Sequence, residues 1–109
     1  MNNNTNFKNS YVQFLNSCLK KEFSKFALIN NGVTFYKAYS YRIEIAVGDE
    51  REILSNGECV VLNVTVDVDD EAYVYTVFDL ATKITYTVPE YVFFYERAVG
   101  KFYTENALM

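Results

Sequence analysis

Apolar and polar residues alternate most regularly over residues 58–80, ECVVLNVTVDVDDEAYVYTVFDL. Every second residue from Val60 to Val68 is valine or leucine, and a period of two is the pattern of a β-strand with one buried face. Residues 73–78 are all aromatic or β-branched, which suits a half-buried sheet. This stretch therefore predicts a β-hairpin with acidic residues 69–71 at its tip.

Upstream of this hairpin, residues 10–28 have apolar side chains every three or four positions, which predicts one amphipathic helix. The apolar stripe consists of Tyr11, Phe14, Leu15, Cys18, Leu19, Phe23 and Phe26. Ser10 and Gln13 fit a capping box at the start of the helix. Asn31 and Gly32 are residues that end helices.

Four further segments complete the predicted elements. Residues 33–47 alternate as a long strand, Gly48 and Asp49 form a turn, and residues 52–54 return from it. The dipeptide Asn56-Gly57 predicts a type I′ turn before the central hairpin. Residues 83–88 predict another strand, which Pro89 ends because proline cannot donate to a ladder. For residues 90–99 the spacing fits a short helix, which we prefer, but the run Val92-Phe93-Phe94-Tyr95 suits a strand equally well.

Short turns between successive strands require antiparallel pairing, and the helix needs one sheet face to cover. The predicted fold class is α+β, with an N-terminal amphipathic helix packed on an antiparallel sheet of about five strands and a short C-terminal helix. The chain of 109 residues predicts a single domain. Residues 1–9 are expected to be a flexible start, and residues 101–109 a partly ordered tail.

The residue types present argue against an enzyme. The chain has no histidine, which removes the commonest general base, the Ser-His and Cys-His pairs and most zinc sites. No phosphate-binding or nucleophile motif occurs, and no cofactor is expected. Cys18 and Cys59 predict buried thiols. Without a signal peptide or a long apolar run, we expect a cytoplasmic protein that does not enter a membrane.

Charge is divided unevenly along the chain. Residues 1–42 carry a net charge of +5 and residues 43–109 a net charge of −9, which together give −4. Such asymmetry indicates electrostatic partners. The predicted partner-binding acids are Asp67, Asp69, Asp70 and Glu71 at the central hairpin tip, joined by Asp49, Glu50 and Glu52 if the two hairpin ends are neighbours. The alternatives are a solvated turn that discourages sheet association, or a divalent metal site, although the glycine and distal glutamate of an EF-hand are missing.

A second candidate surface is the run FYKAYSYRI at residues 35–43. Its tyrosines and basic residues resemble a stacking platform for single-stranded nucleic acid. The residues concerned are Tyr36, Lys37, Tyr39, Tyr41 and Arg42. The negative net charge opposes backbone binding, and strand tyrosines serve packing more often than stacking, so this interpretation is the alternative.

In overall character the chain resembles the small orphan proteins encoded by bacteriophages, including anti-CRISPR and other anti-defence inhibitors. The features that carry the resemblance are the short single domain, the MNNNTN start, the missing catalytic residues and the acidic hairpin DVDDE. The resemblance implies occlusion of a host protein, such as a basic nuclease, in a bacterial cytoplasm. The predicted function is thus a non-enzymatic protein-binding inhibitor, with a nucleic-acid-binding domain or a homo-oligomeric structural component as alternatives.

Overall fold

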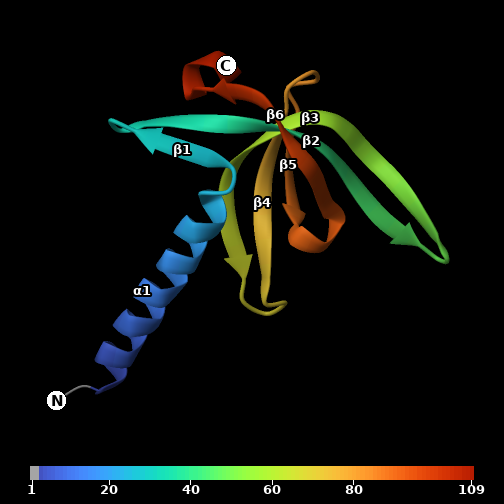
Figure 1. The fold of residues 1–109 in the computed structure, drawn as a ribbon. Helices are drawn as coiled ribbons and strands as arrows, with labels where there is room; N and C mark the ends of the chain where they lie inside the picture. Colours follow the sequence, from blue (N-terminus) through green and yellow to red (C-terminus); the bar gives the residue numbers. More distant parts are fainter. Residues whose placement is uncertain (1–2) are drawn as a thin grey trace.

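The structure, a computed structural model, describes the backbone of residues 3–109 and the side chains from Asn9 onward. One helix, α1 (Asn3–Phe23), precedes a six-stranded antiparallel sheet (Figure 1). The strands are β1 (Ala27–Asn30), β2 (Val33–Val47), β3 (Glu50–Asp67), β4 (Ala72–Asp79), β5 (Thr85–Pro89) and β6 (Phe93–Tyr103). Two short 3-10 turns, η1 (Glu90–Val92) and η2 (Glu105–Leu108), flank β6. The predicted α+β class is confirmed.

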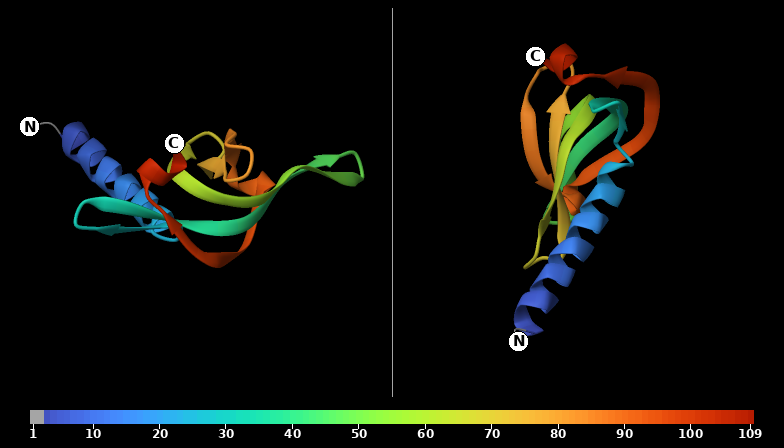
Figure 2. Two further views of the ribbon diagram at one scale, coloured as in Figure 1. Left: turned by 90° about the horizontal axis from the view of Figure 1, so that it is seen from above. Right: turned by 90° about the vertical axis from the view of Figure 1, so that its left-hand side faces the viewer.

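The sheet is a meander whose last strand returns to its first long strand. Strands β2, β3, β4 and β5 pair in order, and β6 pairs with the edge of β2 that faces away from β3. Tyr36 faces Ala27 of β1 on one side and Tyr103 of β6 on the other, so β1 shares an edge of β2 with β3. The three residues of η1 join β5 to β6 across the strand order. The sheet therefore curls strongly, as Figure 2 shows.

Aromatic side chains fill the inside of this curl. Phe26, in the turn between α1 and β1, is fully buried. Its ring centroid lies 5.7 Å from Tyr39, 5.4 Å from Tyr75 and 5.0 Å from Tyr95, each in an edge-to-face arrangement. Such pairs contribute about 0.5–1.5 kcal/mol each beyond area burial. Phe26 therefore holds the end of the helix against three strands at once.

A second, smaller cluster lies apart from this core. Val60 of β3 and Phe78 of β4 face each other across the ladder, and Leu108 of η2 packs on them. Residues 101–109, predicted as a partly ordered tail, thus comprise the end of β6 and an η2 turn with a buried leucine.

The helix differs from its predicted bounds at both ends. It includes residues 3–9 of the predicted flexible start, while residues 1 and 2 lie outside the described residues. Ser10 lies inside the helix, so the predicted capping box is wrong. The helix ends at Phe23, because residues 27–30 pair with β2 as strand β1. No helix in residues 3–109 is long and apolar enough to cross a membrane.

Two predictions about local structure are wrong. Asn56-Gly57 is not a turn but lies within β3, where Gly57 faces Tyr41 of β2 and has a φ of 143°. Residues 90–99 are not a helix, because only η1 is helical and β6 begins at Phe93. In both places, pairing with β2 determines the conformation in place of the local sequence preference.

Candidate functional site

The last turn of α1 is fixed to the sheet by a buried carboxylate. Glu22 is 7% exposed, and its Oε2 accepts the hydroxyl of Tyr75 at 2.5 Å. Its Oε1 lies 2.7 Å from Nζ of Lys25, and this hydrogen bond raises the pKa of Lys25. Burial, followed by the hydrogen bond to Glu22, raises the pKa of the Tyr75 hydroxyl. These contacts set the direction in which the helix leaves the sheet.

Beyond this anchor, α1 and the β3–β4 hairpin project from the same side of the molecule (Figure 1). Tyr11, Val12 and Phe14 on the projecting half are 49%, 52% and 66% exposed. The apolar stripe of the helix was predicted to face the sheet. It does so only near the sheet end, where Leu19 and Phe23 pack against the core.

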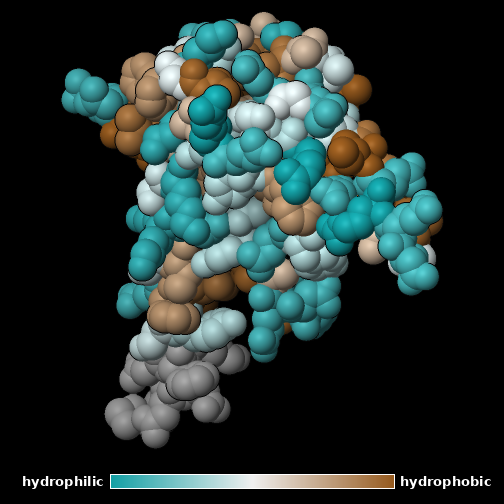
Figure 3. Space-filling view, turned by 45° about the vertical axis from the view of Figure 1, so that its right-hand side comes forward, coloured by the Kyte–Doolittle hydropathy of each residue, from teal (hydrophilic) through white to brown (hydrophobic). Residues whose placement is uncertain are grey.

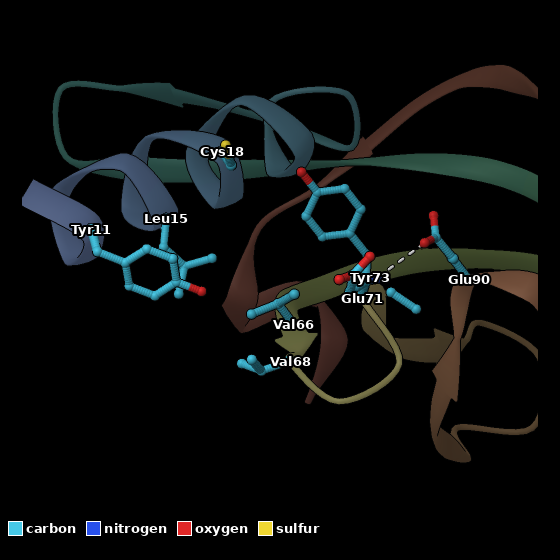
Figure 4. A pocket seen from close by; sticks show the side chains of 9 residues that line it. Tyr11, Leu15, Cys18, Val66, Val68, Glu71, Tyr73 and Glu90 are labelled. Atoms are coloured by element: carbon cyan, nitrogen blue, oxygen red, sulfur yellow. Dashed lines mark hydrogen bonds between the residues drawn. The ribbon is translucent and has the colours of Figure 1, made fainter. Parts of the chain in front are cut away.

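A groove of about 400 Å³ separates the helix from the hairpin. Tyr11, Leu15 and Cys18 line it from α1, and Figure 4 shows them across from the hairpin. On the hairpin side, Val66 and Tyr73 are paired residues that share one face of the sheet.

Two acids also line this groove. Glu71 belongs to the hairpin turn and Glu90 to η1. Glu90 Oε1 accepts the backbone N–H of Tyr73 at 3.2 Å, the interaction drawn in Figure 4. Val68, which is 60% exposed, extends the apolar lining into the turn. The groove is thus apolar inside and acidic at its hairpin end.

The four acids of the hairpin tip have two different roles. Asp67 Oδ1 accepts the backbone N–H groups of Asp69 at 3.1 Å and of Asp70 at 3.4 Å, so this carboxylate shapes the turn. Asp69, Asp70 and Glu71 are exposed, and Glu71 adopts a φ of 51°. Within residues 9–109, none of these four acids takes part in an ion pair. Three carboxylates are therefore presented to solvent beside the groove.

The other predicted acids lie elsewhere. Asp49 lies in the β2–β3 turn and Glu50 and Glu52 lie in the first residues of β3, at the opposite end of this strand from Asp67. At about 3.3 Å per residue, roughly 50 Å of strand path separates Glu52 from Asp67. The condition for a single acidic surface, that the two hairpin ends be neighbours, is not met. Figure 3 shows hydrophilic side chains over both of these projecting ends.

The predicted tyrosine platform is not assembled on one exposed face. Tyr41 is 4% exposed, and its hydroxyl donates to Asp79 Oδ2 at 2.6 Å. The ring of Tyr39 packs among the core aromatics, and its hydroxyl donates to the carbonyl of Lys25 at 2.6 Å. Tyr36 is half-buried beside the Leu108 cluster. These rings are therefore engaged in packing.

The basic members of that run are also placed differently from the prediction. The Arg42 guanidinium lies 4.8 Å from the ring centre of Phe94, and its Nε lies 2.6 Å from Glu44 Oε2. Hydrogen bonds from Arg42 and Arg51 lower the pKa of Glu44. Lys37 is half-buried in the part of β2 that pairs with β6. Arg42 thus stabilises the β2–β3 hairpin through its contacts with Phe94 and Glu44.

Of the two thiols predicted to be buried, Cys59 is buried, whereas Cys18 is half-buried and lines the groove. Cys18 and Cys59 are free thiols, and burial raises the pKa of Cys59, which disfavours the reactive thiolate. The carboxylate of Asp79 accepts the N–H groups of Ala81 at 2.9 Å and Thr82 at 2.8 Å. In the described part of the chain, no group of three or more His, Cys, Asp or Glu residues is placed to hold a metal ion.

Sequence reasoning located the acidic tip but missed the groove beside it. The missed residues are Tyr11, Leu15 and Cys18, which the apolar stripe assigned to the sheet interface. The available signal was the length of the stripe, which extends over more helix than a small sheet can cover. No family model, curated protein or solved structure matches this chain.

Proposed function

We propose that this chain is a non-enzymatic protein-binding module, an inhibitor of the phage-encoded type that occludes a host defence protein such as a CRISPR nuclease. The observation that carries the proposal is the hairpin tip, where Asp69, Asp70 and Glu71 are exposed and outside every ion pair of residues 9–109. Surfaces that bind nucleic acid are rich in lysine and arginine. A compact set of carboxylates complements such a surface and blocks it.

The charge arrangement also defines what the tip contributes. An exposed ion pair adds only about 0–1 kcal/mol, whereas complementary charge mainly increases the association rate and sets specificity. Binding through this tip should therefore be fast and sensitive to salt. The shape of the tip supports this role, because Asp67 fixes the turn and leaves the other carboxylates free to make contacts.

The function is tested in bacteria that carry an active CRISPR system or a restriction system and are challenged with a targeted phage. We expect the wild-type chain to restore plaque formation. The variant Asp69→Asn/Asp70→Asn/Glu71→Gln should lose this effect, while Asp67 still shapes the turn. The matched control, Asp49→Asn/Glu50→Gln/Glu52→Gln, removes equal charge at the distant end of β3 and should retain the effect.

A binding measurement accompanies the plating assay. The purified nuclease of the protected system should bind the wild-type chain at low salt and bind more weakly at moderate salt. No relief of any tested system by the wild-type chain would reject the inhibitor function. Equal activity of both triple variants would reject the tip as its site. Light scattering that shows a stable homo-oligomer without a captured nuclease would favour the structural alternative.

A further inference from the structure

We infer that the groove between α1 and the β3–β4 hairpin binds an amphipathic helix of the partner, with apolar residues facing inward and basic residues facing the hairpin tip. This inference rests on the proposed function and names the segment that the module recognises. Because exposed ion pairs contribute little, affinity has to come from apolar contacts. The groove is the apolar surface adjacent to the tip acids.

The size and lining of the groove set the kind of occupant. Its volume of about 400 Å³ lies near the lower end of ligand sites, roughly 300–1,000 Å³, and admits a few large side chains. Leu15 and Cys18 on one wall and Val66 on the other supply apolar contacts. The exposed Tyr11 and Val68 extend both walls outward, where a helix can be laid along them.

Backbone hydrogen bonding favours a helix over an extended peptide. The backbone of α1 is bonded within the helix, and the hairpin backbone is bonded between β3 and β4, including the pairs Thr65 with Val74 and Val66 with Tyr73. The surface of α1 and the hairpin face that carries Val66 and Tyr73 therefore offer side chains to a segment lying between them, whereas the edge of β3 that faces away from β4 over residues 60–67 has no partner strand within residues 3–109. A segment buried between α1 and this hairpin face has to satisfy its own backbone groups, which an α-helix does. Helices bound in apolar grooves present residues at i, i+3, i+4 and i+7. An extended peptide paired with the free edge of β3 is the competing occupant, and a peptide with scrambled leucines tests it.

The acidic residues at the groove favour a basic helix of the partner, and not a second copy of this chain, as the occupant. Glu71 and Glu90 line the groove, and Asp69 and Asp70 lie beside it. A symmetric contact between two copies puts the same patch on both sides, and like charges would then face one another. A helix flanked by lysine or arginine meets these carboxylates with opposite charge instead.

The probe for the test is a synthetic peptide of about 15 residues, long enough to form a helix on binding. Its leucines stand at i, i+3, i+4 and i+7, and lysines fill most other positions. One comparison peptide has the same composition with the leucines scrambled, and another has glutamate in place of lysine. Fluorescence anisotropy measures affinity, and the rate of iodoacetamide reaction measures access to Cys18. Cys59 is fully buried and supplies little background.

We expect the leucine-lysine peptide to bind, to bind more weakly as salt rises, and to slow alkylation of Cys18. Tyr11→Ser and Val68→Ser should each weaken binding about tenfold, equivalent to about 1.4 kcal/mol. The matched controls are Phe14→Ser on the same helix and Ile53→Ser at the other end of β3, which are exposed but outside the groove. Circular dichroism confirms that all variants are folded.

The outcomes separate this inference from the proposed function. If Asp69→Asn/Asp70→Asn weakens peptide binding while the groove variants do not and Cys18 stays reactive, the groove assignment is overturned and the acidic tip stands. Equal binding of the scrambled peptide overturns the helical occupant. If neither tip nor groove variants change binding, both assignments fail. Self-association that Tyr11→Ser abolishes would identify a second copy as the occupant and overturn the partner helix.

Discussion

Asp79 lies at the end of β4 with 2% of its surface exposed, and its two oxygens accept different sets of donors. Oδ2 accepts the hydroxyl of Tyr41, which also bonds Ser55 at 2.8 Å, and Oδ1 accepts two backbone N–H groups of the following turn. Burial raises the pKa of Asp79, but the hydrogen bonds from Tyr41 and Thr82 outweigh it and leave the pKa below its ordinary value. This residue therefore stabilises the fold as a charged group.

Removal of the Tyr41 hydroxyl is expected to destabilise the protein. Tyr41→Phe keeps the ring but deprives a buried carboxylate of one donor, and a hydrogen bond to a charged group contributes about 1.5–3 kcal/mol. The free energy of unfolding in urea at neutral pH should fall by that amount. Tyr39→Phe is the control, because its lost bond is solvent-exposed and its acceptor is a neutral carbonyl. An equal loss in both variants would contradict a special role for Asp79.

The wild-type protein and Tyr41→Phe should also differ in how their stability depends on pH. Because the folded pKa of Asp79 lies below its ordinary value of 3.8, its contribution to stability is fully present above that pH and is lost as the pH falls through the folded pKa. Tyr41→Phe removes a hydrogen bond that lowers this pKa. The variant should therefore lose less stability than wild type between neutral and strongly acidic pH. Parallel stability curves from urea titrations across this range would contradict the assignment.

At the scale of the element, the sequence predicts strand content better than strand limits. Alternation located β2, the central hairpin and most of β5, because one buried face imposes a period of two. The dipeptide Asn56-Gly57 failed as a turn signal because β2 pairs on both sides of it, at Ser55 and at Cys59. A shift in register between Ile43 and Glu44 absorbs one extra residue there. Such long-range pairing cannot be deduced from local spacing.

Gly57 is the residue that this arrangement of β3 requires. Its φ of 143° is one that residues with a side chain rarely adopt, and a Cβ there would lie 3.5 Å from Asp79 Oδ2, an ordinary contact. The cost of Gly57→Ala should therefore come from the backbone and amount to about 1–3 kcal/mol. The control is Gly48→Ala, at a φ of 62° in an open turn, where the cost is about 1–2 kcal/mol. Thermal and urea unfolding measure the loss of stability in both variants. A smaller loss for Gly57→Ala than for Gly48→Ala would contradict the backbone requirement at Gly57.

At the scale of the molecule, assembly explains why the tip was predictable and the groove was not. The acids of the tip follow one another in the sequence, so their proximity needs no tertiary information. The groove exists because Glu22 and Phe26 fix α1 at one end while the helix and the β3–β4 hairpin extend beyond the core. That direction depends on contacts between residues as distant as Glu22 and Tyr75. Apolar periodicity identifies the helix face but not how far the sheet covers it.

The packing of η2 provides a test of whether this turn belongs to the cooperative fold. Leu108 of η2 is 8% exposed and packs on Val60 and Phe78, on a cluster separate from the main core. Leu108→Ala should reduce the free energy of unfolding by about 2 kcal/mol, the lower end for a buried leucine, because a single short turn packed on a small cluster can relax around the lost side chain. Met109→Ala is the neighbouring control, since Met109 is 91% exposed and its truncation should change stability by less than about 0.5 kcal/mol. If the two variants unfold at the same urea concentration, η2 is not part of the cooperative fold. If only Leu108→Ala is destabilised, η2 belongs to the cooperative fold on the side away from the helix groove (Figure 1), and binding at that groove should be unchanged in this variant.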